Sequence, residues 1–370
     1  MTRQAVWAEV DLGAIKENVR HIRSTLRKGV QFCAVVKADA YGHGAVPVAK
    51  AVLAAGADQL AVAMLQEAVE LRQAGIEVPI LILGYTPPEE AAQVVAQKVT
   101  AAVYSLETAE ALSHAAQQLG CKAIVHLKVD TGMGRIGVQP EEAGVFAAQV
   151  AGLPGIEVEG VFSHFATADC EDKSYAHEQF RRFQEALQNI EAHGVKVAVR
   201  HIANSAATLE LPEYHLDMVR PGIILYGIWP SEEVKRSLPL RPAMSWKACV
   251  SHVKCVPPGS PVSYGCIYKA GQETCIATLP VGYADGWTRL LAGKAAVSLA
   301  GQRAPVVGRI CMDQCMVALP AGAKVAVGEP ALLFGPAGPT VEEVAAWLGT
   351  IPYEIVCMVG KRVPRRYGNA

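Results

Sequence analysis

From residue 13 to about residue 222, short β-branched segments alternate with longer amphipathic segments rich in Ala, Glu and Gln. Such alternation is typical of strand–helix units repeated around a parallel sheet. We predict eight strands here, at Phe32–Lys37, Gln59–Met64, Ile80–Leu83, Thr100–Val103, Ala123–Val129, Ile156–His164, Val199–Ala203 and Leu216–Val219. Eight parallel strands with intervening helices in about 220 residues predict a (β/α)8 TIM barrel.

The segments between these strands carry helix start and stop signals. We expect helices at Pro87–Gln97, Leu106–Leu119, Tyr175–His193 and Ser205–Leu211. Ser105 and Ser174 are suited to cap the N-termini of the second and third helices, and Gly120 and Gly194 to end them.

A proline-rich stretch at residues 230–242 separates the barrel from a region of short valine-containing runs. We predict strands there at Cys249–Val256, Thr274–Thr278, Ala295–Leu299 and Ala331–Phe334. The expected domains are therefore a barrel at residues 12–238 and a mostly β domain at residues 239–370. Residues 1–11 include a strand, Val6–Asp11, that lies outside the eight, and we expect it to pair with the second domain.

Composition narrows the classes of partner. The 370 residues are 51% hydrophobic and 19% charged, with a formal net charge of −1 and no basic or acidic block. We therefore expect a small-molecule ligand, with no nucleic acid and no membrane partner. The N-terminus lacks the apolar segment of a signal peptide, so a cytoplasmic location is expected. In that compartment the ten cysteines should be reduced, and no spacing among them predicts a metal site.

Reactive side chains follow several of the predicted strands, where barrel enzymes build their active sites. Lys37 ends the first strand, where partial burial would lower its pKa and prepare the amine for a Schiff base. The alternative is a lysine that extends into solvent. Tyr41 and the Gly-His-Gly sequence after it predict a flexible turn that can approach an anionic ligand.

Four further strand ends carry candidates of the same kind. They are Lys128 with Arg135, His164, Asn204 with Ser205, and Arg220 with Gly222 and Ile223. Each of these taken alone has an ordinary structural explanation as an ion-pair member or a packed histidine. Together they indicate a single site at the barrel mouth.

Five motifs resemble, in order, those of the alanine racemases, which are pyridoxal 5'-phosphate enzymes of fold type III. They are AVVKADAYGHG from Ala34, MVRPG from Met218, VSYG from Val262, GYADGW from Gly282 and VGRICMDQ from Val307. The resemblance covers nearly the whole chain. It departs from the family pattern at Cys249 and at Cys266-Ile267.

The resemblance implies a role for each residue in holding pyridoxal phosphate. Lys37 would carry the cofactor, and Arg220 would donate to its pyridine nitrogen. Because a guanidinium stays charged, that nitrogen would stay unprotonated, which favours proton exchange over decarboxylation. The cofactor contacts expected beside Lys37 and Arg220 are Tyr41, Arg135, His164, Asn204, Ser205, Gly222, Ile223 and Tyr353.

The resemblance also implies two-base α-proton exchange on the aldimine of alanine, with Lys37 acting on the D-isomer and Tyr264 on the L-isomer. Arg135 and the Met312 backbone N–H would hold the substrate carboxylate, and Tyr283 would line the access path. Lys128 corresponds to a lysine that the family often carries as a carbamate. Because Tyr264 and Met312 lie in the second domain, the implied assembly is a homodimer with shared active sites.

The expected function is interconversion of L-alanine and D-alanine, supplying D-alanine for peptidoglycan. Another racemase of broad or serine specificity, or a basic amino-acid decarboxylase, would use the same scaffold. A non-catalytic pyridoxal phosphate carrier is a further alternative. Tyr264 could also be an ordinary packed loop tyrosine, and Met312 part of an ordinary β turn.

Overall fold

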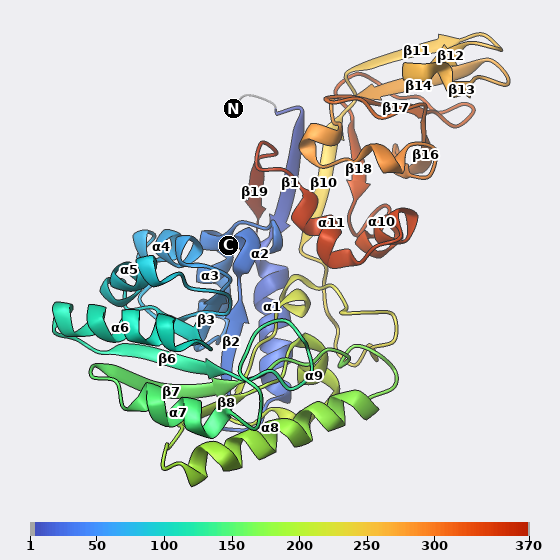
Figure 1. Cartoon of the computed structure of the whole chain (residues 1–370). Coiled ribbons are helices and arrows are strands. Elements are labelled where there is room, and N and C mark those ends of the chain that lie inside the picture. The colour runs from blue at the N-terminus through green and yellow to red at the C-terminus, as the bar shows by residue number, and fades with distance from the viewer. Residues whose placement is uncertain (1–3, 369–370) are drawn as a thin grey trace. The chain divides into compact units, whose positions relative to one another are not determined.

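The structure, a computed structural model, describes residues 4–368, and these form two compact units (Figure 1). One unit contains Ile15–Ala40 and Ala45–Arg241. The other contains the described residues up to Ala14, the short segment Tyr41–Gly44, and the described residues from Pro242 onward. Tyr41–Gly44 thus belongs with the second unit, although the expected ranges put it within the barrel.

In the described part of the chain, the first unit holds an eight-stranded parallel sheet in the order β8-β7-β6-β5-β4-β3-β2-β9. The strands are β2 (Gln31–Val35), β3 (Gln59–Val62), β4 (Ile80–Ile82), β5 (Thr100–Val103), β6 (Ala123–Lys128), β7 (Ile156–Phe162), β8 (Val199–His201) and β9 (Met218–Val219). Backbone hydrogen bonds from Asp217 N to Arg200 O and from Arg220 N to Ala203 O link β9 to β8. The predicted (β/α)8 barrel is therefore confirmed.

Helices connect successive strands and cover the outside of the barrel (Figure 1). They are α1 (Leu12–Thr25), α3 (Ala45–Ala54), α4 (Leu65–Gln73), α5 (Ala91–Ala96), α6 (Leu106–Leu119), α7 (Ala143–Ala151), α8 (Ser174–Ala192) and α9 (Ser205–Glu210). Each helix has buried side chains, and most side chains of the strands are buried as well, as a parallel sheet requires.

The helix boundaries follow local capping chemistry. Helix α6 begins where Ser105 accepts a hydrogen bond from Thr108 N and ends at Gly120, whose φ is 62°, as predicted. The helix expected at Pro87–Gln97 divides instead into a 3-10 turn, η1 (Pro88–Glu90), and α5. Ser174 is the first residue of α8, and the N-cap position before it is Lys173 rather than the serine we expected.

The described residues of the second unit form a nine-stranded sheet in the order β11-β14-β17-β16-β15-β18-β10-β1-β19. The strands are β1 (Val6–Asp11), β10 (Met244–Cys249), β11 (His252–Val256), β14 (Thr274–Leu279), β15 (Ala296–Leu299), β16 (Gln302–Val307), β17 (Cys315–Ala318), β18 (Pro330–Phe334) and β19 (Arg365–Gly368). Strand β1 pairs with β10, as predicted for the strand outside the barrel. The single strand expected at Cys249–Val256 is wrong, because β10 ends and β11 begins within it.

Shorter elements complete the second unit. They are β12 (Pro261–Val262), β13 (Tyr268–Lys269), α10 (Val341–Leu348), α11 (Pro352–Met358) and the 3-10 turns η4 (Tyr264–Cys266), η5 (Tyr283–Asp285) and η6 (Arg289–Leu291). Trp246, Trp287 and Phe334 pack edge to face in its core.

The cysteine expectation requires one correction. Cys255 on β11 and Cys275 on β14 are directly opposite each other in the antiparallel register, and they form a disulfide. The other eight cysteines are free thiols. The pairing of residues 20 apart in sequence depends on strand register, which composition does not reveal.

Among residues 4–368, no helix is both long enough and apolar enough to cross a bilayer.

Candidate active site

Lys37 lies directly after β2 and begins an unusual turn, α2 (Lys37–Tyr41). Ala38, Asp39, Ala40 and Tyr41 all have φ between 52° and 54°, so they form one turn of left-handed helix. L-residues other than glycine, asparagine and aspartate rarely adopt this conformation, because Cβ approaches the following carbonyl oxygen. The Lys37 side chain is half-buried, as we expected for a lysine at the mouth of a packed core.

Two carboxylates hold this turn. Glu67 of α4 accepts hydrogen bonds from Ala38 N at 2.6 Å and from Ala63 N at 2.7 Å. Asp39 accepts one from Ala45 N at 2.7 Å, at the start of α3. These hydrogen bonds fix the backbone at Ala38 and Asp39, which sets the direction in which Lys37 leaves β2. The flexible turn expected at Tyr41 and the Gly-His-Gly sequence after it stays a prediction.

Arg220 follows β9 and is buried, with 3% of its surface exposed. Its Nη1 donates to His201 Nδ1 at 2.6 Å, and its Nη2 donates to the Ser163 carbonyl at 2.8 Å. Burial lowers the pKa of Arg220 to about 10, so it remains a cation at neutral pH. Within residues 4–368, no carboxylate lies within ion-pair distance of this guanidinium.

His164, which follows β7, is in contact with Arg220: its Nδ1 lies 3.2 Å from Arg220 Nη2. Burial, followed by the charges of Arg220, Arg135, Lys128 and Lys37, holds the pKa of His164 well below its usual value. The imidazole is therefore neutral at neutral pH. Four predicted cations act on this one side chain, which indicates that they gather at the same end of the barrel.

Lys128 is the last residue of β6 and is buried, with 2% of its surface exposed. Its Nζ donates to the Val129 carbonyl at 2.8 Å. In the loop that follows, Asp130 accepts hydrogen bonds from Gly132 N and Gly134 N. The loop presents Arg135 to solvent.

The segments that follow β8 and β9 are hydrogen-bonded to each other. Asn204 caps α9 by accepting a hydrogen bond from Ala207 N. The Ser205 hydroxyl accepts one from Gly222 N at 2.8 Å, so it brings the segments after both strands together. Ile223 begins a buried 3-10 turn, η3 (Ile223–Tyr226), immediately afterwards.

Within the second unit, two of the expected cofactor contacts lie close together although 312 positions separate them in sequence. The rings of Tyr41 and Tyr353 have centroids 6.1 Å apart. Gly42 packs against α11, since a Cβ at Gly42 would lie 2.3 Å from the Val356 carbonyl oxygen. Tyr41 is thereby placed beside the helix that carries Tyr353.

The remaining candidates, Tyr264, Tyr283 and Met312, occupy exposed loops of the second unit, with 69%, 43% and 54% of their surfaces accessible. The Tyr283 loop is joined to the Met312 loop by backbone hydrogen bonds, including Ala284 N to Met312 O at 3.0 Å. Ser263, beside Tyr264, donates to the Arg309 carbonyl at 2.5 Å. Arg309 and Met312 belong to one segment, so three sequence motifs meet there.

Sequence reasoning missed three groups of residues that organise these positions. Arg362 bridges Asp285 and Asp313 with hydrogen bonds of 2.7 and 2.6 Å, which ties the Tyr283 and Met312 loops together. Glu67 supports the turn after Lys37. His201, buried inside the barrel, is a partner of Arg220. A histidine inside the predicted strand Val199–Ala203 was the available signal for His201, whereas Glu67 and Arg362 carried none.

The charge of the barrel end indicates its ligand class. Lys37, Lys128, Arg135 and Arg220 all act electrostatically on the neutral His164 imidazole, and a concentration of basic side chains in a partly buried site favours an anionic molecule. Among the described residues, no group of His, Cys, Asp and Glu side chains is arranged to hold a metal ion. The arrangement can therefore bind phosphate or carboxylate groups beside a half-buried lysine.

Two family models match the chain. The model for the N-terminal domain of alanine racemase matches residues 10–230, and the model for its C-terminal domain matches residues 243–367.

Individual proteins are similar over their full lengths. An alanine racemase of Desulfovibrio desulfuricans is 58% identical over 362 residues, which cover 98% of each chain. The structure of alanine racemase from Clostridium difficile 630 has a TM-score of 0.97 at 45% identity and covers 100% of this chain and 97% of its own. The crystal structure of alanine racemase from Bacillus anthracis with bound L-Ala-P has a TM-score of 0.94 at 42% identity, covering 99% and 95%.

Proposed function

This chain belongs to the alanine racemase family, and on that basis we propose that it is an isomerase that interconverts L-alanine and D-alanine by two-base proton exchange. The observation that carries the proposal is the full-length similarity to alanine racemases, at 58% identity in one case, together with cations gathered at one barrel end. A relative with bound L-Ala-P supports alanine as the substrate class.

The residues at the barrel end fit pyridoxal phosphate. This cofactor, when bound, withdraws electrons from the substrate and makes the hydrogen on its α-carbon acidic. Lys37 offers the amine for its aldehyde. For its phosphate, Ser205 would supply a hydroxyl, Asn204 an amide and Ile223 a backbone N–H, and the Gly222 N–H would join them by leaving the Ser205 hydroxyl to which it donates. Tyr41 and Tyr353 of the second unit would supply phenols.

Arg220 accounts for the choice of reaction. It is buried and has no carboxylate partner among the described residues. Because a guanidinium has N–H donors and no acceptor, Arg220 can only donate hydrogen bonds. If Arg220 donates to the pyridine nitrogen of bound pyridoxal phosphate, that nitrogen would stay unprotonated. The cofactor would then withdraw electrons less strongly, which would suit proton exchange and disfavour the decarboxylase alternative.

Proton exchange needs bases on both faces of the substrate. We assign Lys37 Nζ to the D-isomer and Tyr264 Oη to the L-isomer. Because His164 Nδ1 faces the Arg220 guanidinium, which only donates, the neutral ring carries its hydrogen on Nε2 and is suited to donate it to a phenolate. The cations around His164 also favour a phenolate. Arg135 and the Met312 N–H would hold the substrate carboxylate, and Tyr283 would line the path that the substrate takes.

Tyr264 and Met312 are exposed in their own unit, as residues that serve a partner's site must be. We therefore propose a homodimer in which each barrel end is completed by the second unit of the partner. The product D-alanine would supply peptidoglycan synthesis.

The test follows the circular dichroism of L-alanine with purified protein and pyridoxal phosphate. The wild type should convert L-alanine to the racemic mixture. Tyr264→Phe should keep the visible absorbance of the bound cofactor but lower kcat about 10²- to 10⁴-fold, because one base is lost. Borohydride reduction and peptide mapping should find the cofactor on Lys37.

Tyr268→Phe provides the matched control, because Tyr268 is a nearby tyrosine to which we assign no role. Unchanged racemisation in Tyr264→Phe would contradict the two-base assignment. Release of carbon dioxide from lysine, or faster exchange on serine than on alanine, would instead favour the other enzymes that use this scaffold.

A further inference from the structure

A line of hydrogen bonds runs through the barrel interior from Arg220 to a carboxylate that the proposed reaction does not use. Arg220 Nη1 lies 2.6 Å from His201 Nδ1. His201 Nε2 lies 2.8 Å from His126 Nδ1, and His126 Nε2 lies 2.9 Å from Glu159 Oε2. His126 belongs to β6, Glu159 to β7 and His201 to β8, so the line involves three neighbouring strands.

The chemistry of the two ends fixes the direction of every bond in this line. A guanidinium only donates and a carboxylate only accepts. His201 Nδ1 must therefore be the acceptor for Arg220, which leaves the hydrogen of a neutral ring on Nε2. His126 then accepts that hydrogen on Nδ1 and donates its own Nε2 hydrogen to Glu159. Both rings are neutral, and both are Nε2–H tautomers.

Both histidine rings are buried, so water cannot replace their hydrogen-bond partners. His126 and His201 have 1% and 0% of their surfaces exposed, and burial followed by the charge of Arg220 holds the pKa of His201 well below its usual value. Phe162 stacks on His201 with ring centroids 4.9 Å apart. A Cβ at position 160 would lie 2.6 Å from the His126 ring, so Gly160 makes room for it.

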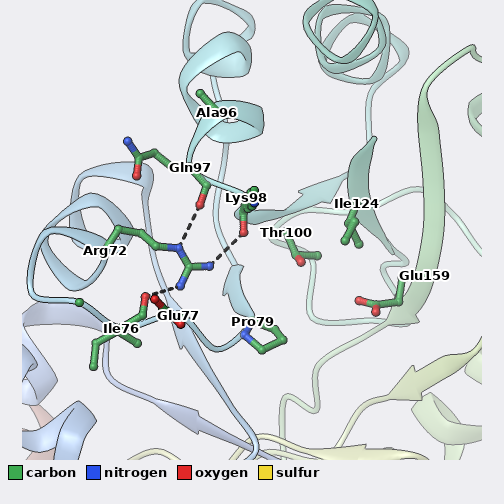
Figure 2. A pocket seen from close by; sticks show the side chains of 11 residues that line it. Arg72, Ile76, Glu77, Pro79, Ala96, Gln97, Lys98, Thr100, Ile124 and Glu159 are labelled. Atoms are coloured by element: carbon green, nitrogen blue, oxygen red, sulfur yellow. Dashed lines mark hydrogen bonds between the residues drawn. The ribbon is translucent and has the colours of Figure 1, made fainter. Parts of the chain in front are cut away.

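Glu159 is the exposed end of the line. Its side chain is 38% exposed, and the hydrogen bond from His126 lowers the pKa of its carboxyl group. It lines a cavity of about 670 Å³ at the ends where β4, β5 and β6 begin, opposite to the end that carries Lys37 and Arg220. Figure 2 shows Glu159 across this cavity from Arg72, whose guanidinium is already occupied by backbone carbonyls.

We propose that Glu159 is a positioning residue for the cofactor site: through His126 and His201 it presents a lone pair to Arg220 and so fixes the guanidinium at the cofactor ring. The role of Glu159 at the cofactor rests on the proposed function. The assignment of His126 and His201 as Nε2–H tautomers does not, because it follows from this chain's own hydrogen bonds.

Replacing the hydrogen-bond acceptor at position 159 by a donor tests this proposal. Glu159→Lys places a donor where His126 needs an acceptor, so His126 must accept on Nε2 and carry its hydrogen on Nδ1. His201 would then present an N–H to Arg220, and two donors would face each other. Glu159→Gln, whose amide oxygen can still accept, should behave as the wild type.

The first measurement is ¹⁵N NMR of histidine-labelled protein without cofactor, which distinguishes Nε2–H from Nδ1–H rings. We expect Nε2–H for both rings in the wild type and Glu159→Gln, and a change to Nδ1–H in Glu159→Lys. The second measurement is the absorbance spectrum and the kinetics of the holoenzyme. Glu159→Lys should shift the cofactor absorbance and lower kcat about 10- to 100-fold, with a smaller effect on KM. Glu77→Lys, in the same cavity, is the matched control.

Nε2–H rings retained in Glu159→Lys would overturn the proposal. The proposal would also be overturned if both rings in Glu159→Lys were Nδ1–H while its cofactor absorbance and kcat equalled those of the Glu77→Lys control. If Glu159→Lys does not fold, Glu159→Leu replaces it, and two exchanging tautomers are then expected instead of one. A wild type with Nε2–H rings but no racemisation would reject the proposed function and leave the tautomer assignment intact.

Discussion

At the scale of the residue, Lys128 shows how an environment changes a side chain's chemistry. Burial, followed by the charge of Arg220, lowers the pKa of Lys128 to about 7 from its ordinary value of 10.5. Asp130, which would raise the pKa, is shared with backbone N–H groups of its own loop. At neutral pH a large fraction of Lys128 is therefore the free amine, which is the form that adds carbon dioxide.

We predict that Lys128 forms a carbamate. In ¹³C-bicarbonate, NMR of the protein should show a carbamate carbon at pH 8. The signal should fall as the pH drops through 7, because the protonated amine cannot add carbon dioxide. It should be absent in Lys128→Ala and retained in Lys122→Ala, which removes an exposed lysine paired with Glu157. A signal of equal strength in both variants would contradict the assignment.

At the scale of the element, the left-handed turn after Lys37 depends on its surroundings. Alanine favours right-handed helix, and nothing in the sequence Ala-Asp-Ala-Tyr predicts four successive positive φ values. The backbone hydrogen bonds that the Glu67 and Asp39 carboxylates accept offset the local cost of this conformation. By contrast, α6 begins and ends where its own sequence indicates, because both caps are local.

Glycine substitutions should therefore have opposite effects in these two elements. Ala38→Gly relieves the left-handed alanine and should raise the free energy of unfolding by about 0.5–1 kcal/mol, after allowing for the entropy of glycine in the unfolded chain. Ala111→Gly, in right-handed α6, should lower it by about 1 kcal/mol. Urea unfolding of both variants measures the two changes. Destabilisation of similar size in both would show that the turn is not left-handed.

At the scale of the whole molecule, the proposed sites need residues from two chains. Lys37 belongs to the barrel unit and Tyr264 to the second unit. Inactive variants at these two positions are therefore expected to complement each other. The cytoplasmic location and the peptidoglycan role remain predictions at this scale.

Co-expression of Lys37→Ala and Tyr264→Phe chains should restore racemisation to about a quarter of the wild-type level. Random pairing makes half of the dimers mixed, and each mixed dimer keeps one intact site of two. Each variant alone should remain inactive under the same circular dichroism assay. If both residues came from one chain, no site would be intact and mixing would restore nothing.

The sequence by itself determined the repeated strand–helix order, the strand that follows the chain's start, the caps of α6 and the strand-end positions of Lys37, His164 and Arg220. Hydrophobic periodicity, helix capping and the glycines and prolines that end elements act over a few residues, so these features can be predicted from the sequence directly.

Only the tertiary structure decided the left-handed turn, the Cys255–Cys275 pairing and the hydrogen-bonded line from Arg220 to Glu159. Each of these features joins groups that lie apart in sequence. Their geometry is set by strand register and barrel closure, which bring buried polar groups together and oblige them to pair.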